Sequence, residues 1–281
     1  MNIRTDLALE HFPDENISEK VHINTRKGTF SITEIILDDD SYTETLGKGK
    51  GRYVTLEGQD LTVFSDTYEN MIYELAQEII KFIPDGDILV VGLGNSDITP
   101  DALGPAVTSK ILATRHLEKE LENETDNFLT SLRRVSAFAG GVLGQTGIET
   151  AEIIRAVCGE IKPDGIIVID ALACSDVSRL GTTIQISDAG ISPGSGVANA
   201  RKELSEKLLG IPVTAVGVPT VVDMYTIVRN FTDSDFHDIP NMMVTSREID
   251  RLIERSAQLI AFGINLALQP SLTLNDIKGL F

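Results

Sequence analysis

The sequence predicts an α/β protein with a largely parallel central sheet, helices on both faces of that sheet (a phosphorylase- or hydrolase-like sandwich) and a β-rich N-terminal element. Two observations support this fold class. From residue 87 onward, short Val- and Ile-rich runs alternate with segments of helical periodicity. These runs are apolar at nearly every position, which is typical of parallel strands that are covered on both faces.

The N-terminal part divides into an arm and the start of the domain. Residues 1–18 are polar and irregular, and we expect them to form a mobile arm. Residues 19–281 are expected to form one domain that begins with the β-rich element 20–57, where VHINT, TFSITEIIL and RYVTLE alternate apolar and polar residues. Within this element, GKGKGR predicts a flexible basic loop. The next segment, DTYENMIYELAQEIIKFI, has the apolar spacing of a helix.

The remaining elements follow in alternation along the chain. Strands are expected at DILVVGLG, RVSAFAG, GIIVIDALA, TTIQIS and PVTAVGVP. Helices are expected at DALGPAVTSKILATRHL, TGIETAEIIRAVCGEI, VANARKELSEKLL, DMYTIVRNF and about 246–268. Thr99 is placed to cap the first of these helices, and Thr146 with Glu149 forms a capping pattern before the second.

Composition and charge exclude several classes of function. The chain has 24 basic and 42 acidic residues, a formal charge of −18, which disfavours direct binding to nucleic acid or to an anionic membrane. No apolar run reaches the roughly 20 residues of a membrane span, and the first residues lack the apolar centre of a signal peptide. We therefore expect a cytoplasmic protein. Cys158 and Cys174 lack a CxxC partner and are expected to be free thiols.

A glycine turn after the first central strand invites a nucleotide-binding interpretation, which the sequence argues against. VVGLGNSD contains Gly92 and Gly94, but Asp97 stands where a dinucleotide fingerprint needs its third glycine. No Gly-Lys-Ser/Thr follows, so the turn is not a P-loop. We expect no cofactor, although a non-catalytic nucleotide-binding or scaffolding protein remains an alternative.

Two aspartates stand where strands of a parallel sheet end. Asp101 lies in the first turn of the helix that follows the glycine turn, where it could also simply stabilise the helix dipole. Asp170 follows the buried run GIIVI, where ionisation is costly without a partner. Because the carboxyl ends of parallel strands meet at one edge, both carboxyl groups could face one crevice. One ionised and one protonated carboxyl group suit general base and general acid catalysis.

Other chemistries have weaker support. None of the four histidines has ligand spacing with these aspartates, so a zinc or nickel site is disfavoured. Magnesium or calcium binding by carboxylates alone stays an alternative, and no metal site is predicted. There is no Gly-x-Ser-x-Gly elbow and no convincing Cys–His pair. SPGSGVANARKE and AFAGGVLGQTGIET are expected to line the site. The first could cradle an anionic group or be a plain capped turn before a helix, and the second could approach a bound chain closely. The substrate-binding candidates are Asn95, Thr99, Gly140, Gly194, Ser195, Gly196, Arg201 and Lys202.

Several of these motifs, in this order, resemble those of the germination proteases of spore-forming bacteria. They are RTDLALE, KGKGRYVTLE, VVGLGNSDITPDALGP, TRHL, GQTGIETAEII, IIVIDALA, TIQISDAGISPGSGV, RKELS and LGIPVTAVGVPTVVD. The resemblance runs from about Ile3 to Asp223 and resumes near MMVTSREID and GINLAL. The fold of that family resembles the hydrogenase-maturation peptidases, an α/β sandwich.

The resemblance implies an endopeptidase that is made as a zymogen, processes itself and degrades small acid-soluble spore proteins at germination. It also implies a homotetramer in the forespore and spore core. The carboxylates implicated in the family match Asp101 and Asp170. Family cleavage sites resemble TDLALE, so self-cleavage is expected between Asp6 and Leu7, which releases residues 1–6. Two features depart from longer family members, namely a shorter segment at 231–241 and a propeptide of only six residues.

The mechanism expected from these residues is aspartate-dependent. Asp101 would activate water, and Asp170 would share the proton or donate it to the leaving amine. Two close carboxyl groups cannot both ionise cheaply, so activity should fall as the shared proton is lost, and a flat profile over about pH 4 to 9 would count against the pair. A metal-dependent maturation-type peptidase is the second enzyme alternative, and sensitivity to EDTA would distinguish it.

Overall fold

The computed structural model describes residues 5–12, 21–43, 48–63, 65–117, 131–192, 203–231 and 242–281. The strands are β1 (Val21–Lys27), β2 (Ser31–Leu37), β3 (Gly51–Glu57), β4 (Ile88–Gly92), β5 (Val135–Ala139), β6 (Gly165–Cys174), β7 (Thr183–Ser187), β8 (Val213–Asp223) and β9 (Met243–Thr245). The α-helices are α2 (Tyr68–Ile80), α3 (Leu103–Thr108), α6 (Leu143–Thr146), α7 (Thr150–Ile161), α8 (Glu206–Leu209), α9 (Met224–Phe231), α10 (Ile249–Leu268) and α11 (Leu274–Lys278). Short 3₁₀ turns are η1 (Ala8–Glu10), η2 (Asp40–Tyr42), η3 (Thr99–Asp101) and η4 (Val177–Arg179).

The described strands form one mixed nine-stranded sheet in the order β1-β2-β3-β7-β8-β6-β4-β5, with β9 paired to β8. The pairs β4–β5, β4–β6 and β6–β8 are parallel, and the other pairs are antiparallel. The α/β class is therefore right, but the prediction of a largely parallel sheet holds only for the part around β4, β6 and β8. The reason lies in the link from β6 to β7, which contains only η4. A link without a crossover helix reverses the chain, so β7 runs antiparallel to β8.

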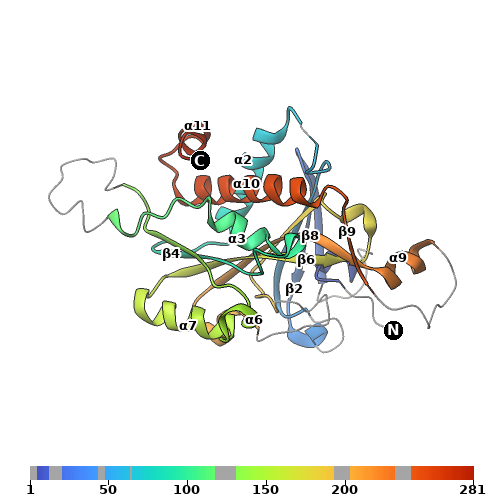
Figure 1. The fold of residues 1–281 in the computed structure, drawn as a ribbon, viewed down its shortest axis with the longest axis horizontal. Coiled ribbons are helices and arrows are strands. Elements are labelled where there is room, and N and C mark those ends of the chain that lie inside the picture. The colour runs from blue at the N-terminus through green and yellow to red at the C-terminus, as the bar shows by residue number, and fades with distance from the viewer. Residues whose placement is uncertain are drawn as a thin grey trace.

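Helices cover both faces of the sheet, as the buried Val and Ile runs predicted. In Figure 1, α2, α3, α10 and α11 lie above the sheet, and α6 and α7 lie below it. Alternate residues of β4 belong to different cores. Val90 packs in the core shared with Leu75 of α2, while Leu89 packs in the core shared with Ile154 of α7. Of the helices in the described ranges, none is both long and apolar enough to cross a membrane.

Several predicted helix starts or lengths are wrong. In the described part of the helix expected at VANARKELSEKLL, only α8 is helical, and Leu204 forms a β-bridge with Ile191 instead. The helix expected from residue 101 is instead η3 followed by the short helix α3, which ends at Thr108. The hydroxyl of Thr108 donates to two carbonyl oxygens of the last turn of α3 and so competes with the backbone hydrogen bonds of the helix. Ile98, not Thr99, is the N-cap residue of η3. Thr146 ends α6, and α7 begins after Glu149, so the predicted capping pattern does not form.

Gly104 allows the close packing of helix on strand for which a dinucleotide fingerprint uses its third glycine. A Cβ atom on Gly104 would lie 2.2 Å from the carbonyl oxygen of Leu93, and one on Gly92 would lie 2.3 Å from the carbonyl oxygen of Gly104. The backbones of α3 and β4 therefore touch. This contact holds η3 and α3 directly against the end of β4.

Gly104→Ala is expected to lower the free energy of unfolding by about 1–3 kcal/mol, because a methyl group there overlaps backbone atoms that cannot rotate away. Gly159→Ala is the matched control, since Gly159 also lies in a helix and a Cβ there meets nothing within 4 Å. It should raise the free energy of unfolding by about 0.5–1 kcal/mol, which is the helix preference of Ala over Gly. Urea titrations of both variants test this, and equal effects would contradict it.

Candidate active site

The loop after β4 is shaped around Asp101. Gly94 has a φ of +102°, and a Cβ there would lie 2.0 Å from the carbonyl oxygen of Asp101, so only glycine fits. The backbone N–H of Asn95 donates to the Asp101 carbonyl at 3.1 Å and to its carboxylate oxygen Oδ2 at 2.8 Å. An amide N–H that donates to a carboxylate favours its ionised form. The sequence folds locally to hold Asp101 as an acceptor.

η3 is fixed to the middle of the sheet. The hydroxyl of Thr220, in β8, donates to the carbonyl of Pro100 at 2.8 Å. η3 also contacts β6, the strand that carries Asp170. Asp101 therefore lies on an element that contacts the strand of Asp170.

Asp170 lies just beyond the point at which β6 stops pairing with β4. β4 pairs with β6 as far as Gly92 and Ile169, and Leu93 adds one more bond to the carbonyl of Ile169 at 2.8 Å. Asp170 follows directly and is 5% exposed. Its Oδ1 accepts a bond from the N–H of Ala171 at 3.0 Å. The carboxyl group is thus buried near the carboxyl end of β4.

The described part of the predicted N-terminal arm, residues 5–12, packs on the sheet. The N–H of Asp6 donates to the carbonyl of Ala173 at 2.9 Å, and the N–H of Ala173 donates back to the Asp6 carboxylate at 2.8 Å. Leu7 is fully buried and packs with Leu172 of β6. Since side chains two apart in a strand share one face, Leu7 lies on the face onto which Asp170 points.

Two side chains hold the peptide group between Asp6 and Leu7. The ammonium of Lys48 donates to the Asp6 carbonyl at 2.6 Å, and the Nε2 amide of Gln185 donates to the same oxygen at 3.0 Å. The Oε1 of Gln185 accepts the N–H of Ala8 at 2.7 Å. Gln185 therefore spans the bond, with one contact on each side. Two donors on one carbonyl oxygen can stabilise the negative charge that develops when that carbonyl is attacked.

Sequence reasoning missed Lys48 and Gln185. Lys48 lies in GKGKGR, which predicted a flexible basic loop, and Gln185 is flanked by two isoleucines in a buried strand. That second signal was available, because a polar side chain on a buried strand needs a partner. Burial lowers the pKa of Lys48, while the nearby charges of Asp6 and Glu10 raise it, and the net direction is down.

The other predicted binding residues are less closely connected to this peptide. Asn95 contributes its backbone to Asp101, and its side-chain oxygen accepts from Gln145 of α6 at 2.7 Å. Thr99 begins η3. Gly140 follows β5, on the far side of β4 from β6. The remaining candidates, Gly194, Ser195, Gly196, Arg201 and Lys202, lie outside the described residues.

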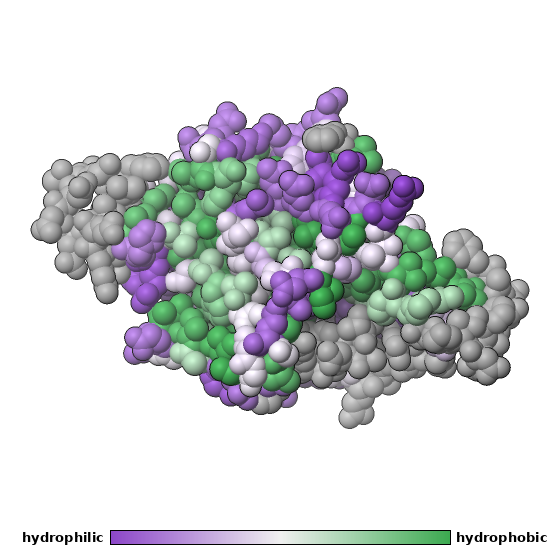
Figure 2. All heavy atoms as spheres, viewed as in Figure 1, coloured by the Kyte–Doolittle hydropathy of each residue, from purple (hydrophilic) through white to green (hydrophobic). Residues whose placement is uncertain are grey.

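Three apolar side chains on the loop after β4 and around α6 are exposed. Ile98, Leu143 and Ile148 are 54%, 42% and 48% exposed, and Gln145 ties α6 to the loop that carries Ile98. Figure 2 shows hydrophobic atoms at the surface in the region of α6 and α7. Exposed apolar groups beside a polar site are typical of surfaces that bind a peptide or protein chain.

Cysteine and metal chemistry find little support in the described residues. Cys158 and Cys174 are buried free thiols, as predicted, and burial raises the pKa of Cys174 to about 12, so it stays protonated. Over the described ranges, no three His, Cys, Asp or Glu side chains are grouped closely enough to hold a metal ion. Asp223 serves the fold, since its carboxylate accepts the N–H and the hydroxyl of Thr226 in the first turn of α9.

Comparison with known proteins identifies close sequence relatives. The family model of the germination proteases matches residues 7–239. The germination protease of Clostridium tetani (strain Massachusetts / E88) is 40% identical over 323 residues, which cover 99% of each chain. That of Bacillus subtilis (strain 168) is 40% identical over 291 residues, covering 98% of this chain and 76% of its own. Among solved structures, the NiFe hydrogenase maturation protease HycI from Thermococcus kodakarensis KOD1 aligns with a TM-score of 0.37 and 20% identity, over 66% of this chain and 98% of HycI.

Proposed function

The chain belongs to the germination protease family, as its motifs predicted, and from this premise we propose that it is an endopeptidase that processes itself and degrades small acid-soluble spore proteins during germination. The same family membership leads us to propose a homotetramer in the forespore and spore core. Self-processing would remove residues 1–6 by cleavage between Asp6 and Leu7.

The observation that best supports self-processing is the set of hydrogen bonds that hold the peptide group between Asp6 and Leu7. The carbonyl of Asp6 accepts from Lys48 and from Gln185, and Gln185 also binds the amide two residues further on. A carbonyl bound by an ammonium and an amide is polarised toward attack. The bond flanked by these contacts is the bond at which the motif TDLALE predicts cleavage.

The proposed reaction is attack of water on the Asp6 carbonyl carbon. Asp101, whose ionised form the Asn95 amide favours, takes a proton from the water as a new C–O bond forms. Lys48 and Gln185 stabilise the resulting oxyanion. Asp170, a buried carboxyl group, donates its proton to the Leu7 nitrogen as the C–N bond breaks. The products are a free carboxyl group on Asp6 and a free amine on Leu7.

Incubation of the purified full-length protein at mildly acidic pH tests this function. The N-terminal mass, read over time, is expected to fall by residues 1–6 only, and the processed protein is expected to cleave an added small acid-soluble spore protein. EDTA should leave both rates unchanged, because the proposed reaction uses carboxyl groups to move protons and side-chain donors to stabilise the oxyanion, without a metal ion. A chain that stays intact and also spares the spore protein would refute the proposal, and loss of activity with EDTA would favour the metal-dependent alternative.

A further inference from the structure

Tyr53 of β3 lies beside the loop that carries Lys48. Its hydroxyl donates to the carbonyl of Gly49, the residue after Lys48, at 2.8 Å. The Tyr53 side chain is buried, and it belongs to the same apolar core as Ala8 and Phe12 of the N-terminal segment. Tyr53 therefore connects the core under the N-terminal segment to the loop that supplies the ammonium.

The phenol of Tyr53 stays protonated and so remains a donor. Burial raises its pKa above the ordinary tyrosine value, and the negative charges of Asp188, Asp40 and Glu203 raise it further. A phenol has a single proton to donate, and here that proton lies on the Gly49 carbonyl. The bond is therefore kept at the pH values at which the protein is expected to process itself.

The two donors to the Asp6 carbonyl are held in different ways. Gln185 is part of β7, and pairing with β3 fixes its backbone. Lys48 lies outside the strands and helices, and its side chain is a long, flexible stem with a compact ammonium. A donor acts on a developing oxyanion only when it is already in place. The position of Lys48 thus depends on the contacts of its loop, of which the Tyr53 bond is adjacent to it.

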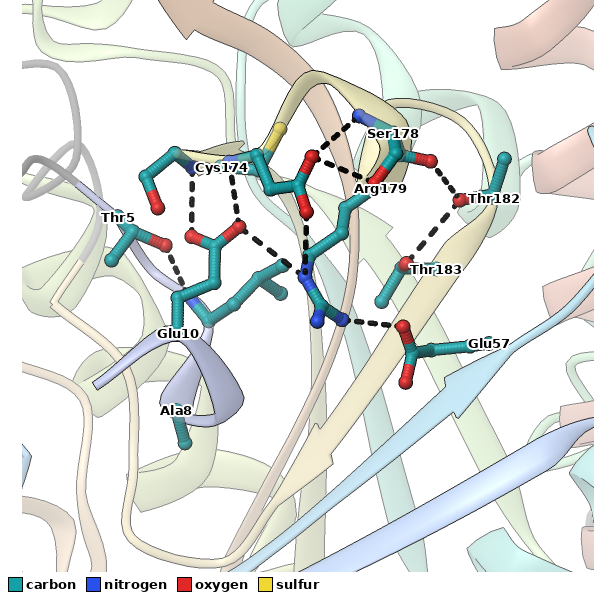
Figure 3. Close-up of polar contacts among 12 residues, drawn as sticks. Thr5, Ala8, Glu10, Glu57, Cys174, Ser178, Arg179, Thr182 and Thr183 are labelled. Carbon is teal, nitrogen blue, oxygen red and sulfur yellow. Dashed lines mark hydrogen bonds and ion pairs between the residues drawn. The ribbon is translucent and has the colours of Figure 1, made fainter. Parts of the chain in front are cut away.

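Contacts that do not involve Lys48 hold the N-terminal segment on the sheet. The N–H of Asp6 donates to the Ala173 carbonyl, and the N–H of Ala173 donates to the Asp6 carboxylate. Figure 3 shows a second anchor, where the carboxylate of Glu10 faces the guanidinium of Arg179, with Oε1 3.5 Å from Nε. The same carboxylate accepts two backbone N–H groups beyond the end of β6, at 2.7 and 2.9 Å. A displaced Lys48 would therefore leave the scissile peptide in place and remove its charged donor.

We propose that Tyr53 is a positioning residue for self-processing, and that its hydroxyl, by holding the Gly49 carbonyl, keeps the Lys48 ammonium on the Asp6 carbonyl oxygen. This inference rests on the proposed function, in which that oxygen becomes the oxyanion. Tyr53 acts through the loop and takes no part in bond making. The motif KGKGRYVTLE carries both Lys48 and Tyr53, so the donor and the residue that positions it belong to one short stretch of sequence.

Tyr53→Phe tests the proposal, because it removes one oxygen atom and keeps the ring in the core. Processing at the Asp6–Leu7 bond is expected to slow by about 10-fold or more, since a misplacement of about 1 Å can cost about 10²-fold. The rate is read from the N-terminal mass over time.

Tyr68→Phe is the matched control. The phenol of Tyr68 in α2 donates to the carbonyl of Arg255 at 2.9 Å, and Tyr68 packs against the core that contains Val54. Val54 adjoins Tyr53 in β3, so its side chain points to the other face of the sheet. Both variants lose a bond from a phenol to a carbonyl, and both should lower the urea midpoint to a similar degree. Tyr68→Phe should nevertheless process at the wild-type rate.

The double variant Tyr53→Phe/Lys48→Met distinguishes positioning from a general loss of stability. It should process as slowly as Lys48→Met alone, because a residue that acts through Lys48 has no further effect once the ammonium is gone. Effects of the two substitutions that multiply would overturn the proposal, and so would a wild-type rate in Tyr53→Phe. In either case self-processing itself would stand.

Acetylation by an N-hydroxysuccinimide ester reads the position of Lys48 without any cleavage. It is followed by mass spectrometry in the Asp101→Asn background, which is expected to keep residues 1–6 attached. Lys48 is half-buried and should react more slowly than Lys50, which is exposed in the same loop. Adding Tyr53→Phe should raise the ratio of the Lys48 rate to the Lys50 rate several-fold, and adding Tyr68→Phe should leave it unchanged.

The acetylation ratio also separates this inference from the proposed function. If the wild-type protein does not process itself, the proposed function has failed, but a ratio that rises in Tyr53→Phe still supports the positioning of Lys48 and an unchanged ratio overturns it. If Tyr53→Phe does not fold, the protein with Tyr53 intact decides. A Lys48 that reacts as fast as Lys50 would overturn the proposal, and a slower reaction would support it.

Discussion

Asp170→Asn is expected to keep residues 1–6 attached to the chain under conditions in which the wild-type protein loses them, and Asp101→Asn is expected to do the same. Each substitution keeps the size of the side chain, but it removes a carboxyl group that accepts or donates the proton in the proposed reaction. General acid–base groups contribute about 10²–10⁴-fold to rates. The rate of N-terminal processing, read by mass, should fall by this order in either variant.

Asp97→Asn is the matched control for this pair. Asp97 lies in the same loop as Asp101 and is exposed, and within the described part of the chain its carboxylate accepts a 3.1 Å bond from the side-chain amide of Gln145. It should process at the wild-type rate. The double variant of Asp101 and Asp170 should be no slower than the slower single variant, because groups that act as a unit are not additive. If either single variant processes at the wild-type rate, that carboxyl group is not catalytic. If Asp97→Asn also loses processing, the effect of the substitutions comes from the geometry of the loop and not from a catalytic carboxyl group.

Much of the sheet could be predicted from local patterns. Continuous apolar runs predicted β4 and β6. That Asp101 and Asp170 face one crevice stays a prediction, and the contact between η3 and β6 is consistent with it. The direction of β7 could not be read from its composition, because direction depends on the length and content of the link before it. Strand composition alone overstated how parallel the sheet is.

The contacts that hold the Asp6 carbonyl were beyond local patterns for a different reason. Lys48 and Gln185 are 42 and 179 residues from Asp6 in the sequence. Their convergence depends on how β3 and β7 pair and on where residues 5–12 cross the sheet, which no periodicity encodes. The arm itself is short and polar at its ends, yet Leu7, Ala8 and Phe12 are buried. A short segment is easily mistaken for a mobile arm when its few apolar residues pack into a core that distant parts of the chain form.

Lys48→Met is expected to slow processing at the Asp6–Leu7 bond by about 10²–10³-fold, the usual effect of removing one donor from a developing oxyanion. Methionine keeps the length of the side chain and loses the ammonium. Lys48→Arg should retain part of the rate. Lys50→Met is the matched control, since Lys50 is exposed in the same loop and, within the described ranges, donates its backbone N–H to Asp40. A wild-type rate in Lys48→Met would refute the oxyanion role.

The pH dependence separates a catalytic role of Lys48 from a structural one. Burial lowers the pKa of Lys48 in the folded protein, so between that lowered value and the ordinary lysine value the unfolded chain binds more protons. Deprotonation of Lys48 therefore makes the folded state more stable as pH rises through this window. The same deprotonation removes the charged donor from the Asp6 carbonyl, so processing should slow while the free energy of unfolding rises. Lys48→Met should abolish both trends together. Processing and stability that fall in parallel at alkaline pH would mean that Lys48 only holds the arm in place.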